Sequence, residues 1–270
     1  MTATHWIELD GAANVRDVAG LPTTDGAAVR PGRLIRSDNL QSLSDSDVRT
    51  LVDDVGVRAI VDLRTGVEVR SEGPGPMTRE PAVLVRHLSL FPEAGETTDA
   101  AAAEDGATQN NPVLPWQSRE LPETDDERRR GAAGVYLKYL DDRADSVVDA
   151  LRTIAGTPGA TIVHCAAGKD RTGVIVAFAL AEVGVTHEAI VEDYARSGER
   201  IGAIFERLRT SHTYAEDVTA KQIDEHRPRA MTMDRLLQAV DELHGGVPPW
   251  LRAHGWTDDD AAALRAKLLD

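Results

Sequence analysis

His164-Cys165-Ala166-Ala167-Gly168-Lys169-Asp170-Arg171-Thr172-Gly173 forms a loop between two apolar segments of the chain. The apolar run Thr161-Ile162-Val163 leads into it and a longer apolar segment follows from Val174, which predicts a strand, a tight loop and a helix. A loop that closes on a helix N-terminus directs backbone N–H groups and the positive end of the helix dipole at one point. The stretch therefore predicts an anion site, with Cys165, the only cysteine of the chain, at its rim.

The side chains of this loop favour phosphate chemistry. Arg171 follows Cys165 after five residues, and its planar guanidinium suits two phosphate oxygens. Such positive surroundings favour the thiolate, which is the nucleophilic form of cysteine. Gly168 and Gly173 let the backbone approach a ligand closely. We predict that the Cys165 thiolate attacks phosphorus while Ala166-Ala167-Gly168-Lys169 and Arg171 bind the phosphoryl group.

Two other interpretations of the loop fit its residues less well. A lone cysteine is usually a small buried hydrophobe, but a core cysteine needs no adjoining Gly-Lys-Asp-Arg-Thr-Gly loop. Gly168-Lys169 also suits a nucleotide-binding P-loop, but that motif requires Ser or Thr where this chain has Asp170, and its first glycine is missing here. The residues therefore favour a reactive cysteine.

The loop also resembles a known signature. His-Cys-x5-Arg-Thr resembles that of the cysteine-dependent tyrosine phosphatases. The fuller His-Cys-x-x-Gly-Lys-Asp-Arg-Thr-Gly is similar to the atypical bacterial family of tyrosine and multi-specificity phosphatases, which has a secreted mycobacterial member. Lys169 and Asp170 match the loop residues that separate this family from the eukaryotic type.

Other segments extend the resemblance over nearly the whole chain. Asn14–Gly20 and Gly32–Ser37 resemble the opening pattern of the family, with Val15 in place of an aromatic residue and Ala19 in place of a glycine. Asp62-Leu63-Arg64-Thr65, continued to the next glutamate, is similar to the family pattern Asp-Leu-Arg-Ser-x-x-Glu. The resemblance implies an α/β fold, with a central, mostly parallel sheet flanked by helices.

The resemblance further implies one phosphatase domain over residues 1–270. Residues 92–130 do not share it, and their composition predicts a flexible insertion. The resemblance implies a helical lid over residues 198–232. The alternative is that the apolar stripe that begins at Ile201 is ordinary core. Hydrophobic periodicity predicts one long amphipathic helix over 135–154.

Three residues outside the loop are further candidates for the site. The β-branched run over 57–62 predicts a buried parallel strand, which brings Asp62 and Arg64 to the sheet edge where ligands gather. The alternative is that these two residues cap the next helix. Arg16 either reaches the phosphate or binds Asp17 and backbone carbonyls.

Charge and composition narrow the classes of partner. The formal net charge is −15 and the isoelectric point is near 4.9, so we do not expect a nucleic-acid partner. The overall negative charge also repels phosphate esters, so an anionic substrate requires cations close to the site. One cysteine fits a reducing compartment. Residues 1–10 show no cleavable leader, and the longest apolar run is about a dozen residues, too short to span a bilayer. A cytoplasmic protein is the default expectation, with export lacking a cleavable signal as the alternative.

The predicted mechanism forms a cysteinyl-phosphate that water hydrolyses to inorganic phosphate, without metal or cofactor. The Thr172 hydroxyl can stabilise the sulfur as the leaving group of the second step, and His164 orients the loop. The resemblance implicates both Asp170 and Asp62 as the general acid, and the sequence leaves that choice open. Pro115-Trp116 does not reproduce the acid-bearing loop of other tyrosine phosphatases.

The expected substrate is a phosphotyrosine protein, with phosphoserine and phosphothreonine as further substrates. A phosphoinositide or a small phosphorylated metabolite is the alternative, because the additional cation Lys169 suits polyanionic groups. A catalytically inactive phosphate-binding module is a third interpretation, but such modules usually lack the cysteine or the arginine that this loop retains.

Overall fold

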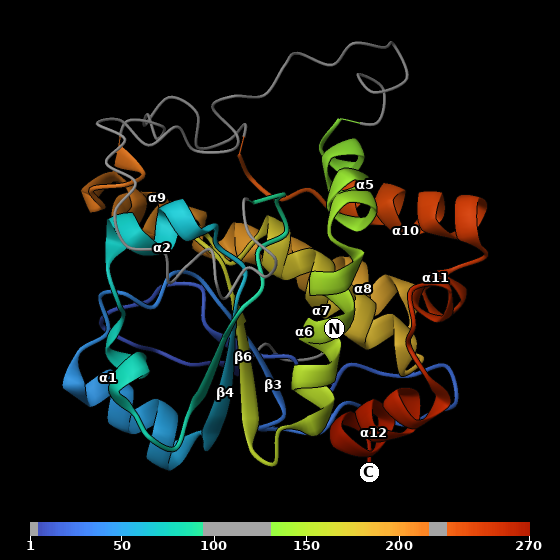
Figure 1. Ribbon diagram of the computed structural model, residues 1–270, viewed down its shortest axis with the longest axis horizontal. Helices are drawn as coiled ribbons and strands as arrows, with labels where there is room; N and C mark the ends of the chain where they lie inside the picture. The colour runs from blue at the N-terminus through green and yellow to red at the C-terminus, as the bar shows by residue number, and fades with distance from the viewer. Residues whose placement is uncertain (1–4, 94–130, 216–225) are drawn as a thin grey trace.

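The computed structural model describes residues 5–93, 131–215 and 226–270 (Figure 1). The predicted insertion over 92–130 lies outside these residues except for its first two positions, and the predicted lid over 198–232 lies partly outside them.

In the part of the chain that the structure describes, six strands form a central sheet in the order β1-β2-β3-β6-β4-β5. The first two pairings are antiparallel, and the strands from β3 to β5 are parallel. The strands are β1 (His5–Trp6), β2 (Arg16–Asp17), β3 (Leu34–Ser37), β4 (Val57–Asp62), β5 (Leu84–His87) and β6 (Ala160–His164). His164 pairs with Ser37 on one side and with Asp62 on the other, so the carboxyl ends of three parallel strands meet beside the loop. The predicted mostly parallel α/β sheet is confirmed.

Helices cover both faces of this sheet. Because successive strand side chains alternate in direction, Val61 and Val163 pack into one core and Ile60 and Ile162 into the other. The smaller core lies under α1 (Asp45–Arg49), η1 (Thr50–Asp54) and η2 (Pro76–Arg79). The larger core packs α5 (Ala132–Asp142), α6 (Ala144–Gly156), α7 (Asp170–Glu182), α8 (His187–Arg196), α10 (Ala230–His244), α11 (Val247–Ala253) and α12 (Asp258–Leu268).

α7 lies inside the larger core, and every residue from Arg171 to Leu180 is buried. Its sequence is apolar on all sides, which is the pattern of a helix surrounded by other elements. Because α7 cannot shift without repacking this core, the end of the loop that it carries has a fixed position.

The prediction of one long helix over 135–154 is wrong, because Arg143 separates α5 from α6. Arg143 leaves helical geometry at φ −138° and ψ 45°. Its guanidinium donates to both carboxylate oxygens of Asp145 and to the carbonyl of Phe91. The apolar periodicity continues through the break, so hydrophobic pattern alone does not reveal it.

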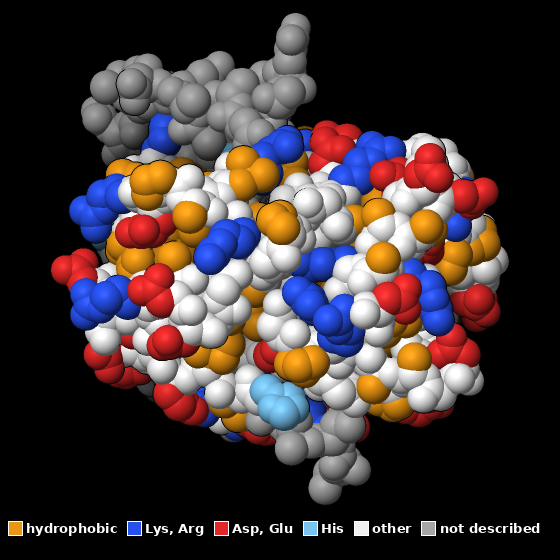
Figure 2. Space-filling view, turned by 90° about the horizontal axis from the view of Figure 1, so that it is seen from below, with side chains coloured by type: hydrophobic (Ala, Val, Ile, Leu, Met, Phe, Trp, Pro, Cys, Tyr) orange, Lys and Arg blue, Asp and Glu red, His pale blue; other side chains and the backbone are white. Residues whose placement is uncertain are grey.

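The remaining elements complete the surroundings of the loop. α2 (Gly66–Glu72) follows β4, and η3 (Ser197–Arg200) leads from α8 into α9 (Ile201–Thr210). Among the described residues, no helix combines the length and the apolarity needed to cross a membrane. On the face shown in Figure 2, acidic and basic side chains are interspersed, so its described part carries no large patch of one sign.

Candidate active site

The loop between β6 and α7 has a backbone that only glycine permits at one position. Gly168 has φ +66°, and a Cβ added there would lie 2.3 Å from the carbonyl oxygen of Ser37. The loop therefore presses against the end of β3 at Gly168, which is why this residue has no side chain.

Three carbonyl groups of the loop point outward and are held by the framework. Asn14 Nδ2 donates to the carbonyl oxygens of Ala167 and Gly168 at 3.0 and 3.1 Å. The backbone N–H of Asn39 donates to Ala166 at 3.1 Å, and Arg36 Nη2 donates to Gly168 at 3.0 Å. In a trans peptide the N–H points opposite to the carbonyl. The amides that follow these carbonyls are thus directed to the inside of the loop, as an oxyanion site requires.

Arg16 supports this framework and does not line the cavity above the loop. It is completely buried, and its Nε donates to Asp193 Oδ1 at 3.0 Å. The other oxygen of Asp193 accepts from Arg36 at 2.5 Å. Burial disfavours the ionised carboxylate, but the two guanidinium groups outweigh it and hold the pKa of Asp193 below its usual range. Burial, aided by Arg36, lowers the pKa of Arg16 to about 10, so it stays charged near neutral pH.

Cys165 lies at the floor of the cavity, with 2% of its surface exposed. The hydroxyl of Thr172, one turn into α7, donates to its sulfur at 3.3 Å. This contact stabilises negative charge on the sulfur, because a hydroxyl donor interacts more strongly with an anion than with a neutral group.

Arg171 is oriented by a buried carboxylate from α2. Its Nη1 and Nη2 donate to the two oxygens of Glu68 at 2.7 and 2.9 Å, and Nη1 also donates to the carbonyl of Leu63. Tyr214 donates its hydroxyl to the same carboxylate at 2.8 Å. Despite burial, the charge of Arg171 keeps the pKa of Glu68 below its usual value. The guanidinium plane is therefore fixed before any ligand arrives.

Asp62 and Arg64 form a buried pair behind the loop and do not line the cavity. Arg64 donates from Nε and Nη2 to the carboxylate of Asp62, at 2.9 and 2.5 Å. Although burial opposes it, the charge of Arg64 holds the pKa of Asp62 far below its usual range. His164 Nε2 lies 3.6 Å from Asp62, and burial lowers the pKa of His164 to about 4, so this imidazole is neutral at pH 7.

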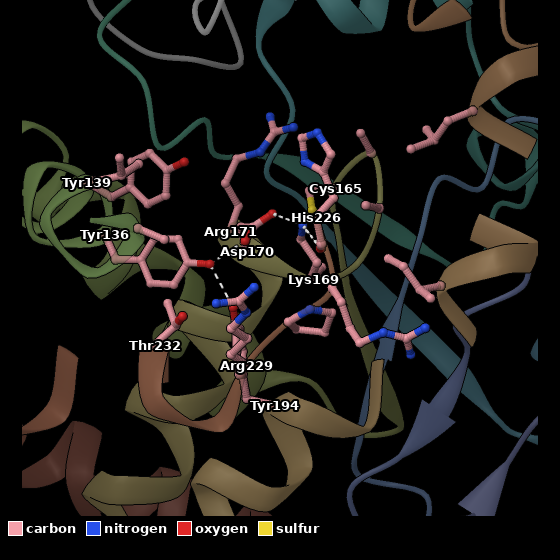
Figure 3. A pocket seen from close by; sticks show the side chains of 18 of the residues that line it. Tyr136, Tyr139, Cys165, Lys169, Asp170, Arg171, Tyr194, His226, Arg229 and Thr232 are labelled. Atoms are coloured by element: carbon pink, nitrogen blue, oxygen red, sulfur yellow. Dashed lines mark hydrogen bonds and ion pairs between the residues drawn. The ribbon is translucent and has the colours of Figure 1, made fainter. Parts of the chain in front are cut away.

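A cavity of about 650 Å³ opens above Cys165 and Arg171 (Figure 3). All four tyrosines of the chain and two of its three phenylalanines line it. These aromatic residues are Phe91, Tyr136, Tyr139, Tyr194, Phe205 and Tyr214. The stripe of α9 that the sequence assigned either to core or to a lid forms one wall, through Ile201, Phe205 and Leu208. The closing of a lid stays a prediction.

Asp170 and Lys169 lie at the edge of this cavity. Asp170 is the first residue of α7, and its side chain is 37% exposed. Its Oδ1 accepts a hydrogen bond from the hydroxyl of Tyr136, and its Oδ2 lies 3.3 Å from Lys169 Nζ. Lys169 also donates to the carbonyl of His226 at 2.7 Å. Of the two candidate acids, Asp170 alone lines the cavity.

Several residues of the site were not singled out from the sequence. Glu68 appears there only as the end of a family pattern, although Thr65 and Glu68 form a capping box that signals the start of α2. Asn14 and Arg36 stand in segments that carry the resemblance, but nothing local assigns them, or Asp193, to the loop. Within the described ranges, no group of three or more His, Cys, Asp and Glu residues could hold a metal ion.

Several known proteins are similar to this chain over nearly all of its length. A model of the tyrosine phosphatase family matches residues 7–270. The triple specificity protein phosphatase PtpB of Mycobacterium tuberculosis is 30% identical, over 97% of this chain and 98% of the relative. A putative tyrosine-protein phosphatase of Cupriavidus necator is 28% identical, over 98% of this chain and 89% of the relative. A tyrosine-protein phosphatase of Nostoc commune is 26% identical, over 98% and 83%.

Proposed function

Because the chain belongs to the tyrosine phosphatase family, we propose that it hydrolyses phosphate monoesters, above all phosphotyrosine, with Cys165 as the nucleophile. The observation that carries this proposal is the position of the Cys165 sulfur at the floor of an aromatic cavity, beside Arg171 and the inward-directed amides of the loop. This arrangement supports charge stabilisation on the three equatorial oxygens of a transferring phosphoryl group.

The reaction proceeds in two displacements at phosphorus. In the first, the Cys165 thiolate forms the S–P bond, the O–P bond to the leaving group breaks, and the leaving oxygen takes a proton from a general acid. In the second, water attacks phosphorus and gives a proton to the carboxylate that the first step left, the S–P bond breaks to restore the thiolate, and inorganic phosphate leaves. Arg171 binds the phosphoryl oxygens in both steps, with Glu68 fixing its plane. Thr172 stabilises the sulfur when it departs.

Asp170 is the general acid in this proposal. Its carboxyl group lies at the cavity and is partly exposed, so it can reach a leaving oxygen. Asp62 is assigned a supporting role, because a carboxylate held by Arg64 with a pKa far below its usual range cannot carry a proton near neutral pH. Arg16 and Arg64 likewise support the loop, while residues 166–169 and Arg171 bind the substrate.

The aromatic lining supports an aryl phosphate as the substrate. A phenyl ring buried among tyrosine and phenylalanine side chains gains both apolar burial and ring contacts. The similarity to a phosphatase whose name states triple specificity supports phosphoserine and phosphothreonine as further substrates. We infer a phosphorylated protein as the partner in the cell.

Cys165→Ser tests the nucleophile. The variant keeps the volume of the loop but lacks the thiolate, so hydrolysis of p-nitrophenyl phosphate should fall by about a thousandfold or more. Phosphate release is the measurement, and binding of vanadate checks that the site is still formed. Undiminished turnover in a variant that still binds vanadate would refute the mechanism.

A phosphoinositide or a small phosphorylated metabolite is the second candidate substrate. It is favoured by Lys169, Arg227 and Arg229, which bring additional positive charge to the same cavity. The net charge of −15 works against docking on anionic membranes. Phosphotyrosine peptides and short-chain phosphoinositides should be compared by kcat/KM, with Arg229→Met as a probe. A selective loss on the phosphoinositide in that variant would favour the second candidate.

A further inference from the structure

We propose that Tyr136 is a positioning residue for Asp170, which it holds toward the cavity and supports when the carboxyl group gives up its proton. This inference rests on the proposed role of Asp170 as the general acid. It goes further because it assigns a function to a residue of α5, an element that contributes nothing else to the proton transfer.

The tyrosine ring is held rigidly on the wall of the cavity. Tyr136 is 2% exposed, and its ring stacks on Tyr139 with centroids 5.9 Å apart and an angle of 20° between the planes. It also packs against the ring of Tyr194 from α8 in a T-shaped arrangement, with centroids 6.4 Å apart. Figure 3 shows Tyr136 pointing from α5 toward Asp170. A side chain packed this way loses little further entropy when its hydroxyl binds a partner.

The hydroxyl of Tyr136 links two other elements. It donates to Oδ1 of Asp170, and it lies 2.8 Å from the hydroxyl of Tyr194. Because Tyr136 uses its single proton toward Asp170, Tyr194 is the donor in the second bond. Burial, together with the nearby charge of Asp170, raises the pKa of both tyrosines above the ordinary value, so both are neutral donors throughout the pH range of an assay.

The basic side chains around Asp170 come from two parts of the chain. Lys169 and Arg171 flank it in the sequence, and His226, Arg227 and Arg229 line the same cavity from the segment before α10. Of these groups, Lys169 lies 3.3 Å from Oδ2 of the carboxylate, and the hydroxyl of Tyr136 binds the other oxygen, Oδ1. The two contacts together set the direction of the carboxyl group.

The hydrogen bond from Tyr136 to Asp170 contributes to catalysis during proton transfer. As the proton leaves Asp170 for the leaving oxygen, the carboxyl group becomes an anion, and the bond from Tyr136 strengthens with the growing charge. The hydroxyl keeps its own proton. Tyr136 thus stabilises the charged product of the step and speeds transfer most for leaving groups that depend on protonation.

Tyr136→Phe removes this hydroxyl and retains the ring. With phenyl phosphate, whose leaving group needs protonation, kcat should fall about tenfold while KM stays within about twofold. With p-nitrophenyl phosphate the loss should be smaller. Because the carboxylate loses a hydrogen-bond donor in this variant, the alkaline limb of the kcat profile should move to higher pH.

The same substitution in an Asp170→Asn background is the control. If Tyr136 acts through Asp170, Tyr136→Phe should change kcat by less than about twofold in the Asp170→Asn background. Equal losses in both backgrounds, or an unmoved alkaline limb in the single variant, would overturn the inference alone. An Asp170→Asn variant that hydrolyses both esters at the rates of the parent enzyme would instead overturn the assignment of the acid, and this inference with it.

If Tyr136→Phe does not fold, Tyr194→Phe is the second variant. It removes the hydroxyl that donates to Tyr136 and so weakens the hydrogen bond from Tyr136 to Asp170. An alkaline limb of the kcat profile that does not move to higher pH in Tyr194→Phe would count against the inference.

Discussion

Glu68 decides how Arg171 is presented to the loop. The two side chains are 103 positions apart in sequence and meet through two hydrogen bonds, with the carboxylate of Glu68 completely buried. Tyr214 and the backbone N–H of Thr65 use the remaining capacity of the carboxylate. Each oxygen of the Glu68 carboxylate thus accepts two hydrogen bonds. The ion pair therefore orients the guanidinium, and neither buried charge lacks a partner.

Glu68→Gln should therefore damage both stability and activity. It leaves the charge of Arg171 uncompensated, which we expect to cost about 3 kcal/mol in the free energy of unfolding. It should also lower kcat/KM on aryl phosphates by about tenfold or more. Urea titration and steady-state kinetics measure the two effects. Glu72→Gln on the same helix is the matched control, with an expected cost below about 1 kcal/mol; similar costs at both positions would contradict the role of Glu68.

At the scale of elements, the loop depends on its contact with the end of β3. Gly168 has positive φ and lies so close to Ser37 that no side chain fits. Gly56, between η1 and β4, has φ +75°, but no atom of the described residues lies within 4 Å of an added Cβ. The two glycines thus share the backbone requirement and differ in the space around them.

Alanine at these two glycines separates the two effects. Gly56→Ala should cost about 1–2 kcal/mol, the penalty of the left-handed conformation. Gly168→Ala adds a clash with backbone that cannot move away, so it should cost more and displace the loop amides. Thermal unfolding gives the first quantity, and loss of vanadate binding by Gly168→Ala alone reports the second. Equal costs with retained vanadate binding would show that the contact with Ser37 is unimportant.

At the scale of the whole molecule, the buried ionisable groups around the loop make the stability of the fold depend on pH. Asp62, Asp193 and Glu68 all have pKa values held below the ordinary range. Their contribution to stability is present above about pH 4 and is lost below it. His164 acts at higher pH, because burial lowers its pKa from 6.5 to about 4.

The stability of the chain should accordingly decrease from pH 6.5 toward pH 4 through His164. In this window the unfolded chain binds a proton that the folded chain excludes, so the folded state loses up to about 3 kcal/mol relative to the unfolded state. His164→Asn removes this titration. Unfolding free energies at several pH values, compared between parent and variant, measure it; parallel curves would exclude His164 as the source.

The sequence by itself determined the elements and the nucleophilic loop. Strand, loop and helix around Cys165 follow from the hydrophobic pattern, and so does the buried strand over 57–62 that leads to Arg64. These features depend on residues a few positions apart, which is the range over which backbone geometry and side-chain spacing act. The hydrophobic pattern does not predict the break between α5 and α6 at Arg143, because the pattern continues through it.

Only the tertiary structure decided which polar groups surround the loop. Asn14 and Gly168 are 154 positions apart, and Arg16 and Asp193 are 177 apart, yet each pair is in contact. The sequence left both Asp62 and Asp170 as candidates for the general acid. In the fold, Asp62 is paired with Arg64, whereas Asp170 lies at the cavity beside Tyr136. Such partners are set by how the strands and helices pack, because burial requires each charged group to find a complement that no local spacing encodes.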